Sequence, residues 1–339
     1  MDKLQKYIIQ NLSTLFLTIF LSLFSIASII FLIKLATFTA IIQLSILEML
    51  KLYAFRLPEL LFFTLPISFF VAAALTIYRL SNDNEIIVLF SLGIHPKFIM
   101  RTLLKPALLL SGLLLFNFLI VFPHAKFSSD HFIAKKKNEA KFNLSASEFG
   151  HKFGDWLLYI GKEDKNKKYA EVFLFNKNEQ EEVLIEADQA EIINKDGVLT
   201  LKLLNGEGYS YSKDKFTQID FQEMYINNTF QTNNIVYETP LEYWTSDNAK
   251  DKRTKMLITD TLLSLFPLFS LFLVLSISIV HARHHNSMIY LYMFFGILIY
   301  YGATIALQKQ LVYYTIPLVS ILWLTTTYYI YRKTIVSRF

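Results

Sequence analysis

The chain has 339 residues, of which 53% are hydrophobic and 16% aromatic, and its mean hydropathy is +0.37. Soluble domains of this size are rarely so apolar, so the composition predicts an integral membrane protein. The net charge of +5 suits a protein beside anionic lipid headgroups and calls for no nucleic acid, and the absence of cysteine excludes disulfides and thiol catalysis.

Six long runs carry no charged residue, and each can supply the ~20 apolar residues that cross a hydrocarbon core about 30 Å thick. The first run is far longer than the ~7–15 apolar residues of a signal peptide, so it too is predicted to be a span. The runs lie between Lys6 and Lys34, Glu59 and Arg79, Lys105 and His124, Asp260 and His281, Arg283 and Lys309, and Lys309 and Arg332. We therefore predict six transmembrane helices, three on each side of a long polar insert.

Basic residues are concentrated on alternate connections between these spans. One side carries Lys3, Lys6, Arg79, Lys97, Arg101, Lys105, Arg283, Arg332, Lys333 and Arg338. The short connections on the other side carry only Lys34, Lys51, Arg56 and Lys309. The positive-inside rule therefore predicts that both termini are cytoplasmic and that the insert lies outside.

A short apolar segment, NDNEIIVLFSLG, follows the second predicted span at residues 82–93. Asn82 and Glu85 have the spacing of a helix-capping box, and Gly93 predicts where the helix ends. The apolar run 86–90 is too short to span a bilayer, and the predicted topology places it in the cytoplasm. We expect it to be buried in the membrane interface or in a partner protein.

The insert, residues 126–253, differs from the rest in composition. Turn signals at 194–197 and at Asn205-Gly206 separate short segments rich in β-branched and aromatic residues. These segments are DWLLYIG, YAEVFLF, EVLIEADQAEII, GVLTLKLL, YSYSKDKFTQIDF and EMYINNTF. We predict a β-sandwich or jelly roll, either a passive docking domain or one that holds something apolar inside. The predicted domains are thus helices 1–3 with the short helix (1–125), the β domain (126–253) and helices 4–6 (254–339).

Motifs for chemistry are scarce. The cluster His281-Ala282-Arg283-His284-His285 lacks the three or four converging ligands of a zinc site, and a basic cytoplasmic turn explains it. No G-x-x-x-x-G-K-[ST] loop is present, so the chain is not expected to hydrolyse ATP. The predicted spans hold almost no ionisable groups and no acid pair. We therefore predict no catalytic residue, no metal site and no bound cofactor.

Two alternatives stay open at this point. A lipid-modifying enzyme with the insert as catalytic domain would use His124, His131 or His151, near the outer membrane face. An ABC permease for lipoproteins or peptides commonly has one span before its external domain and three after it, and the three-plus-three pattern argues against this. Lys34 and Lys309 are either snorkelling lysines that mark the interface or contacts for an anionic lipid headgroup.

Three spans, an external β insert and three further spans resemble the LptF/LptG family of lipopolysaccharide-export permeases over essentially the whole chain. The most specific match is the run Glu85, Ile86, Val88, Gly93 and Ile94. Softer matches are Ile33-Lys34-Leu35, ASEFGHKFGDWLLYI and DFQEMYI, and the last two are more similar to the LptF branch.

The resemblance implies a multi-pass subunit of a bacterial inner-membrane ABC exporter, a transporter and not an enzyme. Its implied partners are a paralogous LptG-type permease, a cytoplasmic ATPase dimer that uses the ATP, and a periplasmic jelly-roll bridge protein of the LptC/LptA type. The implied substrate is lipopolysaccharide, taken from the outer leaflet into a cavity between the two bundles and then through the β-jelly-roll domain.

The resemblance also implies site residues. Residues 82–93 would be the coupling helix, docked in a groove of the ATPase through Glu85, Ile86, Val88, Leu89 and Gly93. Lys34 would meet the phosphates of the glycolipid, and Arg56 and Lys309 are further candidates on the same side. The stretch 36–39, Ala-Thr-Phe-Thr, departs from relatives that carry a second positive charge there.

Overall fold

The computed structural model describes residues 2–39, 44–140, 151–153, 156–163, 168–177, 181–195, 198–212, 215–228, 239–245, 250–279 and 288–337. The chain divides into two compact units. A helical unit comprises Met1–Phe132 and Tyr237–Phe339, and a strand unit comprises Ile133–Val236.

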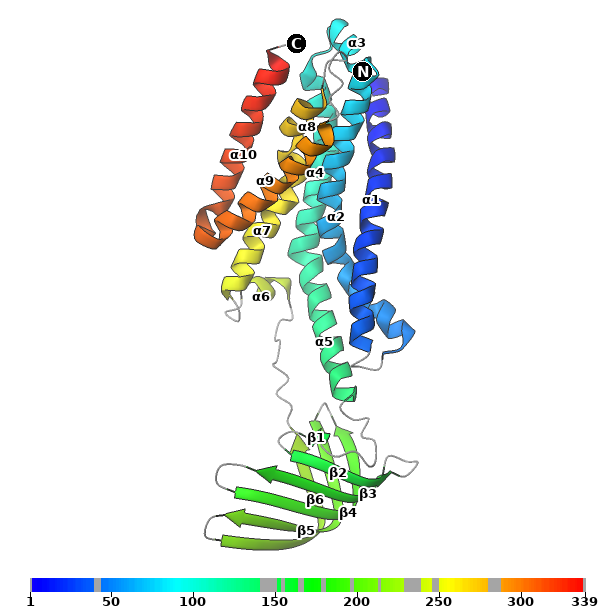
Figure 1. The fold of residues 1–339 in the computed structure, drawn as a ribbon, viewed down its shortest axis with the longest axis vertical. Helices are drawn as coiled ribbons and strands as arrows, with labels where there is room; N and C mark the ends of the chain where they lie inside the picture. The colour runs from blue at the N-terminus through cyan, green and yellow to red at the C-terminus, as the bar shows by residue number, and fades with distance from the viewer. Residues whose placement is uncertain are drawn as a thin grey trace. The chain divides into compact units, whose positions relative to one another are not determined.

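The helical unit is a bundle in which the first helix begins and the last one ends at the same end, beside a short helix α3 (Figure 1). Three of its described elements are not α-helical: η1 and η3 are π-helical turns, and η2 is a 3₁₀ turn. In chain order the elements are α1 (Asp2–Thr39), α2 (Ile46–Asn82), α3 (Glu85–Ser91), α4 (Pro96–Phe116), η1 (Asn117–Val121), α5 (Phe122–Ala140), α6 (Pro240–Thr245), α7 (Lys250–Phe269), α8 (Leu271–Ser278), α9 (Ile289–Gln310), η2 (Val312–Tyr314), α10 (Thr315–Tyr331) and η3 (Arg332–Val336).

Within the described residues, four helices are long and apolar enough to cross a membrane: α1, α2, the continuous helix from Pro96 to Ala134, and α9. A fifth candidate is the pair α7 and α8, bent by 43°. Pro267 lies inside α7 just before the bend, and its missing N–H removes a helix hydrogen bond. These five correspond to the first five predicted spans, whereas α10, with 17 residues, is too short to be counted with them.

Helix α2 is the centre of the bundle. In its most apolar stretch 61% of the residues are buried, against 6% in α1 and 28% in α9. Three consecutive alanines, Ala72 to Ala74, are fully buried in α2, and such small side chains let neighbouring helices approach closely. Because α1 and α9 are covered so little, most of their apolar surface is left for lipid or another protein.

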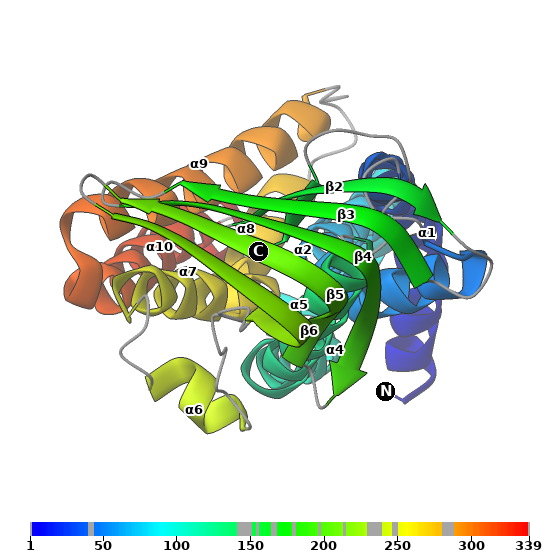
Figure 2. The same cartoon turned by 90° about the horizontal axis from the view of Figure 1, so that it is seen from below.

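In its described residues the strand unit is one antiparallel sheet of six strands in chain order, so a β-rich insert is confirmed. Figure 2 shows β2 to β6 side by side in that order. The strands are β1 (His151–Phe153), β2 (Trp156–Glu163), β3 (Lys168–Lys177), β4 (Glu181–Lys195), β5 (Val198–Ser212) and β6 (Lys215–Asn228).

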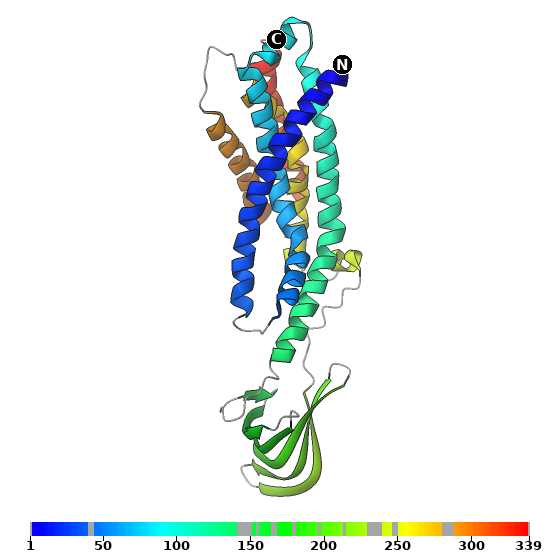
Figure 3. The ribbon, with the colours of Figure 1, turned by 90° about the vertical axis from the view of Figure 1, so that its right-hand side faces the viewer.

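The sheet is strongly curved (Figure 3), and its pairing suggests why. In each of the strands β2 to β6, one residue is left out of the series of paired residues. These unpaired positions lie opposite one another and form a single row across the sheet. Two of them have left-handed backbone, with φ of 57° at Glu171 and 47° at Asn205. We call this the bend row; its residues are Gly161, Glu171, Asp188, Asn205 and Gln222.

The core of the sheet changes phase at the bend row. In β4 the buried residues are Ile185 and Ala187 before the row, and Ala190 after it, so the alternation of two becomes a step of three. In β3 the same step separates Tyr169 from Val172. Since successive strand residues point to opposite faces, this step keeps one face inside on both sides of the bend. Core residues from both halves then belong to one hydrophobic cluster.

The predicted turn at Asn205-Gly206 is wrong, because both residues lie inside β5. The other predicted turn, at 194–197, is confirmed, because Lys195 pairs with Val198. A second reversal lies where Ser212 pairs with Lys215. An asparagine in the left-handed region suits a hairpin turn and an irregularity inside a strand equally well, so the local signal is the same.

Replacing Gly206 by alanine is expected to destabilise the sheet by roughly 1–3 kcal/mol, the usual cost of overpacking. A Cβ at this position would overlap the carbonyl oxygen of Glu186 and lie 2.6 Å from Cζ of Phe221. Hydrogen exchange of the β5 amides in the full-length protein is the measurement, and it should become faster. Gly208→Ala is the matched control, since its nearest neighbour outside the adjoining residues is 3.8 Å away. Equal acceleration in both variants would contradict this account of the bend.

Candidate functional site

Helix α3 has seven residues and lies between α2 and α4. Asn82 is the last residue of α2, and the N-cap of α3 is Asn84, whose φ is 63° and whose side chain makes no capping hydrogen bond. Glu85 is therefore the first residue of the helix. The predicted capping box of Asn82 and Glu85 is wrong, because α2 continues further than the prediction assumed.

The end of α3 is as predicted. Gly93 has a φ of +84°, a conformation that is cheap only for glycine. Its N–H donates to the carbonyl of Phe90 at 3.0 Å, and the N–H of Ile94 donates to the carbonyl of Leu89 at 3.0 Å. This pair of bonds is the Schellman motif, which satisfies the last carbonyls of a helix and stops it.

The apolar side chains of α3 divide between two environments. Ile86 is 1% exposed and belongs to the core of the bundle, which anchors the helix to its own unit. Val88 and Leu92, in contrast, are 53% and 73% exposed, and Leu89 is half-buried. The apolar run is thus buried in part by its own bundle, through Ile86, while Val88 and the C-cap residue Leu92 are exposed.

Glu85 links α3 to the first helix. The hydroxyl of Tyr7 donates a hydrogen bond to Oε1 of Glu85 at 3.1 Å. Among the residues that the structure describes, no lysine, arginine or histidine pairs with this carboxylate. Its negative charge is therefore held in place at the surface and available to a cation from elsewhere.

The three predicted substrate-binding cations are not equivalent. Lys34 is exposed near the end of α1, and within the described ranges it makes no ion pair. Arg56 donates to Oε2 of Glu59 at 2.7 Å and lies 6.0 Å from the ring centroid of Phe31, so it is already engaged. Lys309 is exposed in the last turn of α9, where a cation favours the helix dipole. Of the three cations, Lys34 is the one for which the described residues show neither an ion pair nor a position in the last turn of its helix.

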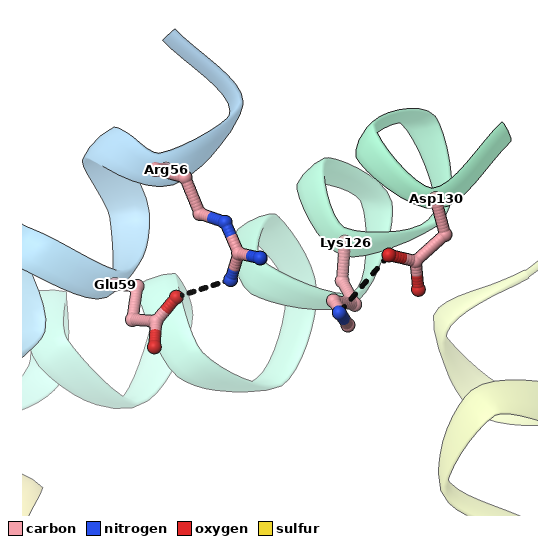
Figure 4. A network of polar contacts seen from close by, with 4 residues as sticks. All are labelled: Arg56, Glu59, Lys126 and Asp130. Atoms are coloured by element: carbon pink, nitrogen blue, oxygen red, sulfur yellow. Dashed lines mark hydrogen bonds and ion pairs between the residues drawn. The ribbon is translucent and has the colours of Figure 1, made fainter. Parts of the chain in front are cut away.

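Two ion pairs, one on α2 and one on α5, lie near each other in the bundle (Figure 4). Arg56 and Glu59 form an ion pair on α2, and Lys126 pairs with Asp130 at 3.0 Å on α5. Nearby, Nδ2 of Asn117 donates to the carbonyl of Pro58 at 2.8 Å and joins η1 to α2.

A cavity of about 200 Å³ lies beside this group. Asp260, only 7% exposed, comes to it from α7, and Glu59 comes from α2. Two acids from helices far apart in the chain thus line one cavity, at the ends of two predicted spans. The lining residues are Glu59, Phe62, Phe63, Asn117, Phe118, Phe122, Met256 and Asp260.

Sequence reasoning missed this pair because each acid was taken only as the boundary of an uncharged run. The whole insert separates Glu59 from Asp260 in the chain, and no local motif connects them. The positions of the two acids were the available signal. Each acid stands at the predicted external end of an uncharged run, so both are expected at the same depth in the membrane.

The histidines named for a lipid-modifying enzyme are not assembled into a site. His124 and His131 are exposed on α5, where the ring of His131 packs against Phe127 at 4.2 Å between centroids. His151 belongs to β1, in the other unit. The cluster 281–285 lies outside the described residues. Elsewhere, in the described part of the chain, no three His, Asp or Glu residues are grouped to hold a metal ion.

A comparison with protein families decides the identity. The family described as "Lipopolysaccharide export system permease LptF/LptG" matches residues 6–331, which is nearly the whole chain. The chain belongs to the LptF/LptG family. A comparison with curated proteins finds no match.

Membership of the LptF/LptG family confirms the resemblance seen in the Glu85 run and in the arrangement of spans around the insert. It makes the chain a multi-pass lipopolysaccharide export permease of the inner membrane, a transporter component and not an enzyme. An LptF/LptG permease works with other proteins of the same export system. The polar groups of the bundle accordingly need an explanation in binding and coupling, not in catalysis.

Proposed function

We propose that the chain is the LptF-type subunit of an ABC exporter, paired with an LptG-type subunit on a cytoplasmic ATPase dimer. The exporter takes lipopolysaccharide from the outer leaflet and passes it through the β domain towards a periplasmic bridge of the LptC/LptA type. The observation that carries this proposal is the family match over residues 6–331, together with an exposed apolar helix, α3, on a chain without a phosphate-binding loop.

The proposed topology has six spans, with α10 extended by η3 as the sixth. Both termini and α3 are cytoplasmic, in agreement with the distribution of lysine and arginine. The domains are proposed at 1–125, 126–253 and 254–339. The curved sheet would be the jelly roll, since its bend row brings core residues of two halves into one cluster.

Coupling is assigned to α3. Ile86 anchors the helix in the bundle, Gly93 ends it, and Val88 and Leu92 present apolar surface outward, with Leu89 beside them. Glu85, at the first turn, would pair with a basic residue of the ATPase. A groove that buries the two exposed side chains would explain why they are tolerated on a short cytoplasmic helix.

The substrate path is proposed to begin between α1 and α9 of this chain and the equivalent helices of the partner. These two helices leave most of their apolar surface uncovered. Exposing acyl chains to water costs about 0.8 kcal/mol per CH₂ group, so a continuous apolar path is needed for extraction. Lys34, exposed near the end of α1, is the proposed contact for the lipid phosphates, and Lys309 and Arg56 are secondary candidates.

Co-purification tests the assembly. The tagged chain, co-expressed with an LptG-type permease and its ATPase, should retain both through gel filtration in detergent. Replacing Val88 and Leu92 together by aspartate should release the ATPase and keep the permease partner, because the membrane interface is untouched. Isolation of the wild-type chain without any ATPase would contradict the proposed function.

A further inference from the structure

Asp260 is a buried acid whose carboxylate has no partner among the described residues. It is 7% exposed in the apolar helix α7, and no hydrogen bond or ion pair of its carboxylate occurs among the described residues. Only its backbone carbonyl is engaged, by the hydroxyl of Ser264 at 2.7 Å. Asp260 is one of the residues that line the cavity, together with Glu59. A buried, unpaired carboxylate is costly, and inside a membrane protein it marks a functional site.

The charges around the cavity do not balance. Arg56 is paired with Glu59, and Lys126 with Asp130 (Figure 4), so each of these two cations already has an acidic partner. Asp260 remains as an acid without a cation partner among the described residues. The described lining of the cavity therefore carries one acid more than its paired cation, Arg56, can balance.

The lining indicates which kind of cation fits. Four phenylalanine rings surround the polar groups, and aromatic rings attract organic cations through their negative faces. The hard divalent ions Ca²⁺ and Mg²⁺ instead take about six or more oxygen ligands. Among the described lining residues, Glu59, Asn117 and Asp260 are the ones with side-chain oxygens. An ammonium group, which combines charge with hydrogen-bond donors, matches this mixture of rings and carboxylates.

The place of the cavity indicates where the ammonium group comes from. Glu59 and Asp260 each begin an uncharged run, so both lie where the hydrocarbon core gives way to headgroups. The side chain of Glu59 is 39% exposed and Phe63 is 48% exposed, so these two lining residues reach the outer surface of the bundle. We propose that this cavity binds the primary ammonium group of a lipid headgroup, held between Asp260 and Glu59.

The test uses the full-length chain in detergent micelles, titrated with short-chain phosphatidylethanolamine and with its N-acetylated form, which lacks the ammonium charge. Tryptophan fluorescence reports on the site, because Trp244 lies 4.8 Å from the ring of Phe118 in the cavity wall. Phosphatidylethanolamine should give a saturable change at a mole fraction at least about tenfold lower than the N-acetylated lipid, as expected for a charge-assisted hydrogen bond.

Asp260→Asn should remove this preference, whereas the control Asp130→Asn, an acid that does not line the cavity, should keep it. Without added lipid, Asp260→Asn should unfold at no lower temperature than the wild type, because an unpaired buried charge is lost. A preference that survives in Asp260→Asn would overturn the proposal. So would saturation by free ethanolamine, which would make the ligand a soluble amine, or by magnesium chloride, which would make it a metal ion.

Discussion

Replacing Glu85 by arginine is expected to abolish lipopolysaccharide export while the exporter still hydrolyses ATP. If Glu85 meets a basic residue of the ATPase, arginine puts like charges together, which costs several kcal/mol and lowers the export rate at least about a hundredfold. Glu85→Ala removes the attraction without adding repulsion, so export should fall less. The measurement is ATP hydrolysis and lipopolysaccharide release in the same proteoliposomes.

The hydrogen bond from Tyr7 supplies the control, because it gives Glu85 a second, internal task. Tyr7→Phe deletes that bond, together with the contact of the same hydroxyl with Asn11, at a cost of roughly 1 kcal/mol, and should leave coupling nearly intact. If the internal contact were the whole role of Glu85, Tyr7→Phe and both Glu85 variants would have similar, mild effects. That pattern would show that α3 does not couple the ATPase to the permease through Glu85.

Replacing Lys34 by alanine is expected to weaken lipopolysaccharide binding by about tenfold, and by glutamate considerably more. A charge-assisted hydrogen bond to a phosphate contributes about 1.5–3 kcal/mol, and Lys34 has no ion pair in the described part of the chain that would compete for it. Affinity of the purified complex for lipopolysaccharide, measured at low and high salt, is the readout. The wild type should lose more affinity with salt than Lys34→Ala does.

Lys309→Ala is the comparison for Lys34, because Lys309, a secondary candidate for the lipid phosphates, is also an exposed lysine near the end of a helix. Its favourable place at the end of α9 gives it a structural role as well, so its loss should weaken lipopolysaccharide binding clearly less than the loss of Lys34. A snorkelling role for Lys34 predicts the same small effect at both positions. Equal affinities of the two variants would therefore show that Lys34 has no special contact with the lipid phosphates.

Local signals were sufficient where the fold depends on local chemistry. Charge-free runs predict the first five candidate spans, because crossing a membrane requires length and apolarity and little else. Gly93 predicts the end of α3, because a left-handed residue stops a helix whatever surrounds it. The family could likewise be identified from the Glu85 run and the order of segments.

Features that depend on distant contacts could not be predicted in this way. Asn205 has the same local signature in a bend row as in a hairpin, and only pairing with β4 and β6 distinguishes the two. The burial of Ile86 depends on helices packed around α3. Glu59 and Asp260 come together only because α2 and α7 are neighbours in the bundle, and that adjacency has no trace in either segment alone.

The central claim is that this chain moves lipopolysaccharide with energy from a separate ATPase. The most direct measurement places the complex of this chain, its LptG-type partner and the ATPase in lipopolysaccharide-loaded vesicles and follows transfer to a soluble periplasmic jelly-roll acceptor. Transfer should require ATP and this chain, and should fail with Glu85→Arg although ATP is consumed. ATP hydrolysis that depends on the chain but transfers no wild-type lipopolysaccharide, or that releases a lipoprotein instead, would contradict the account.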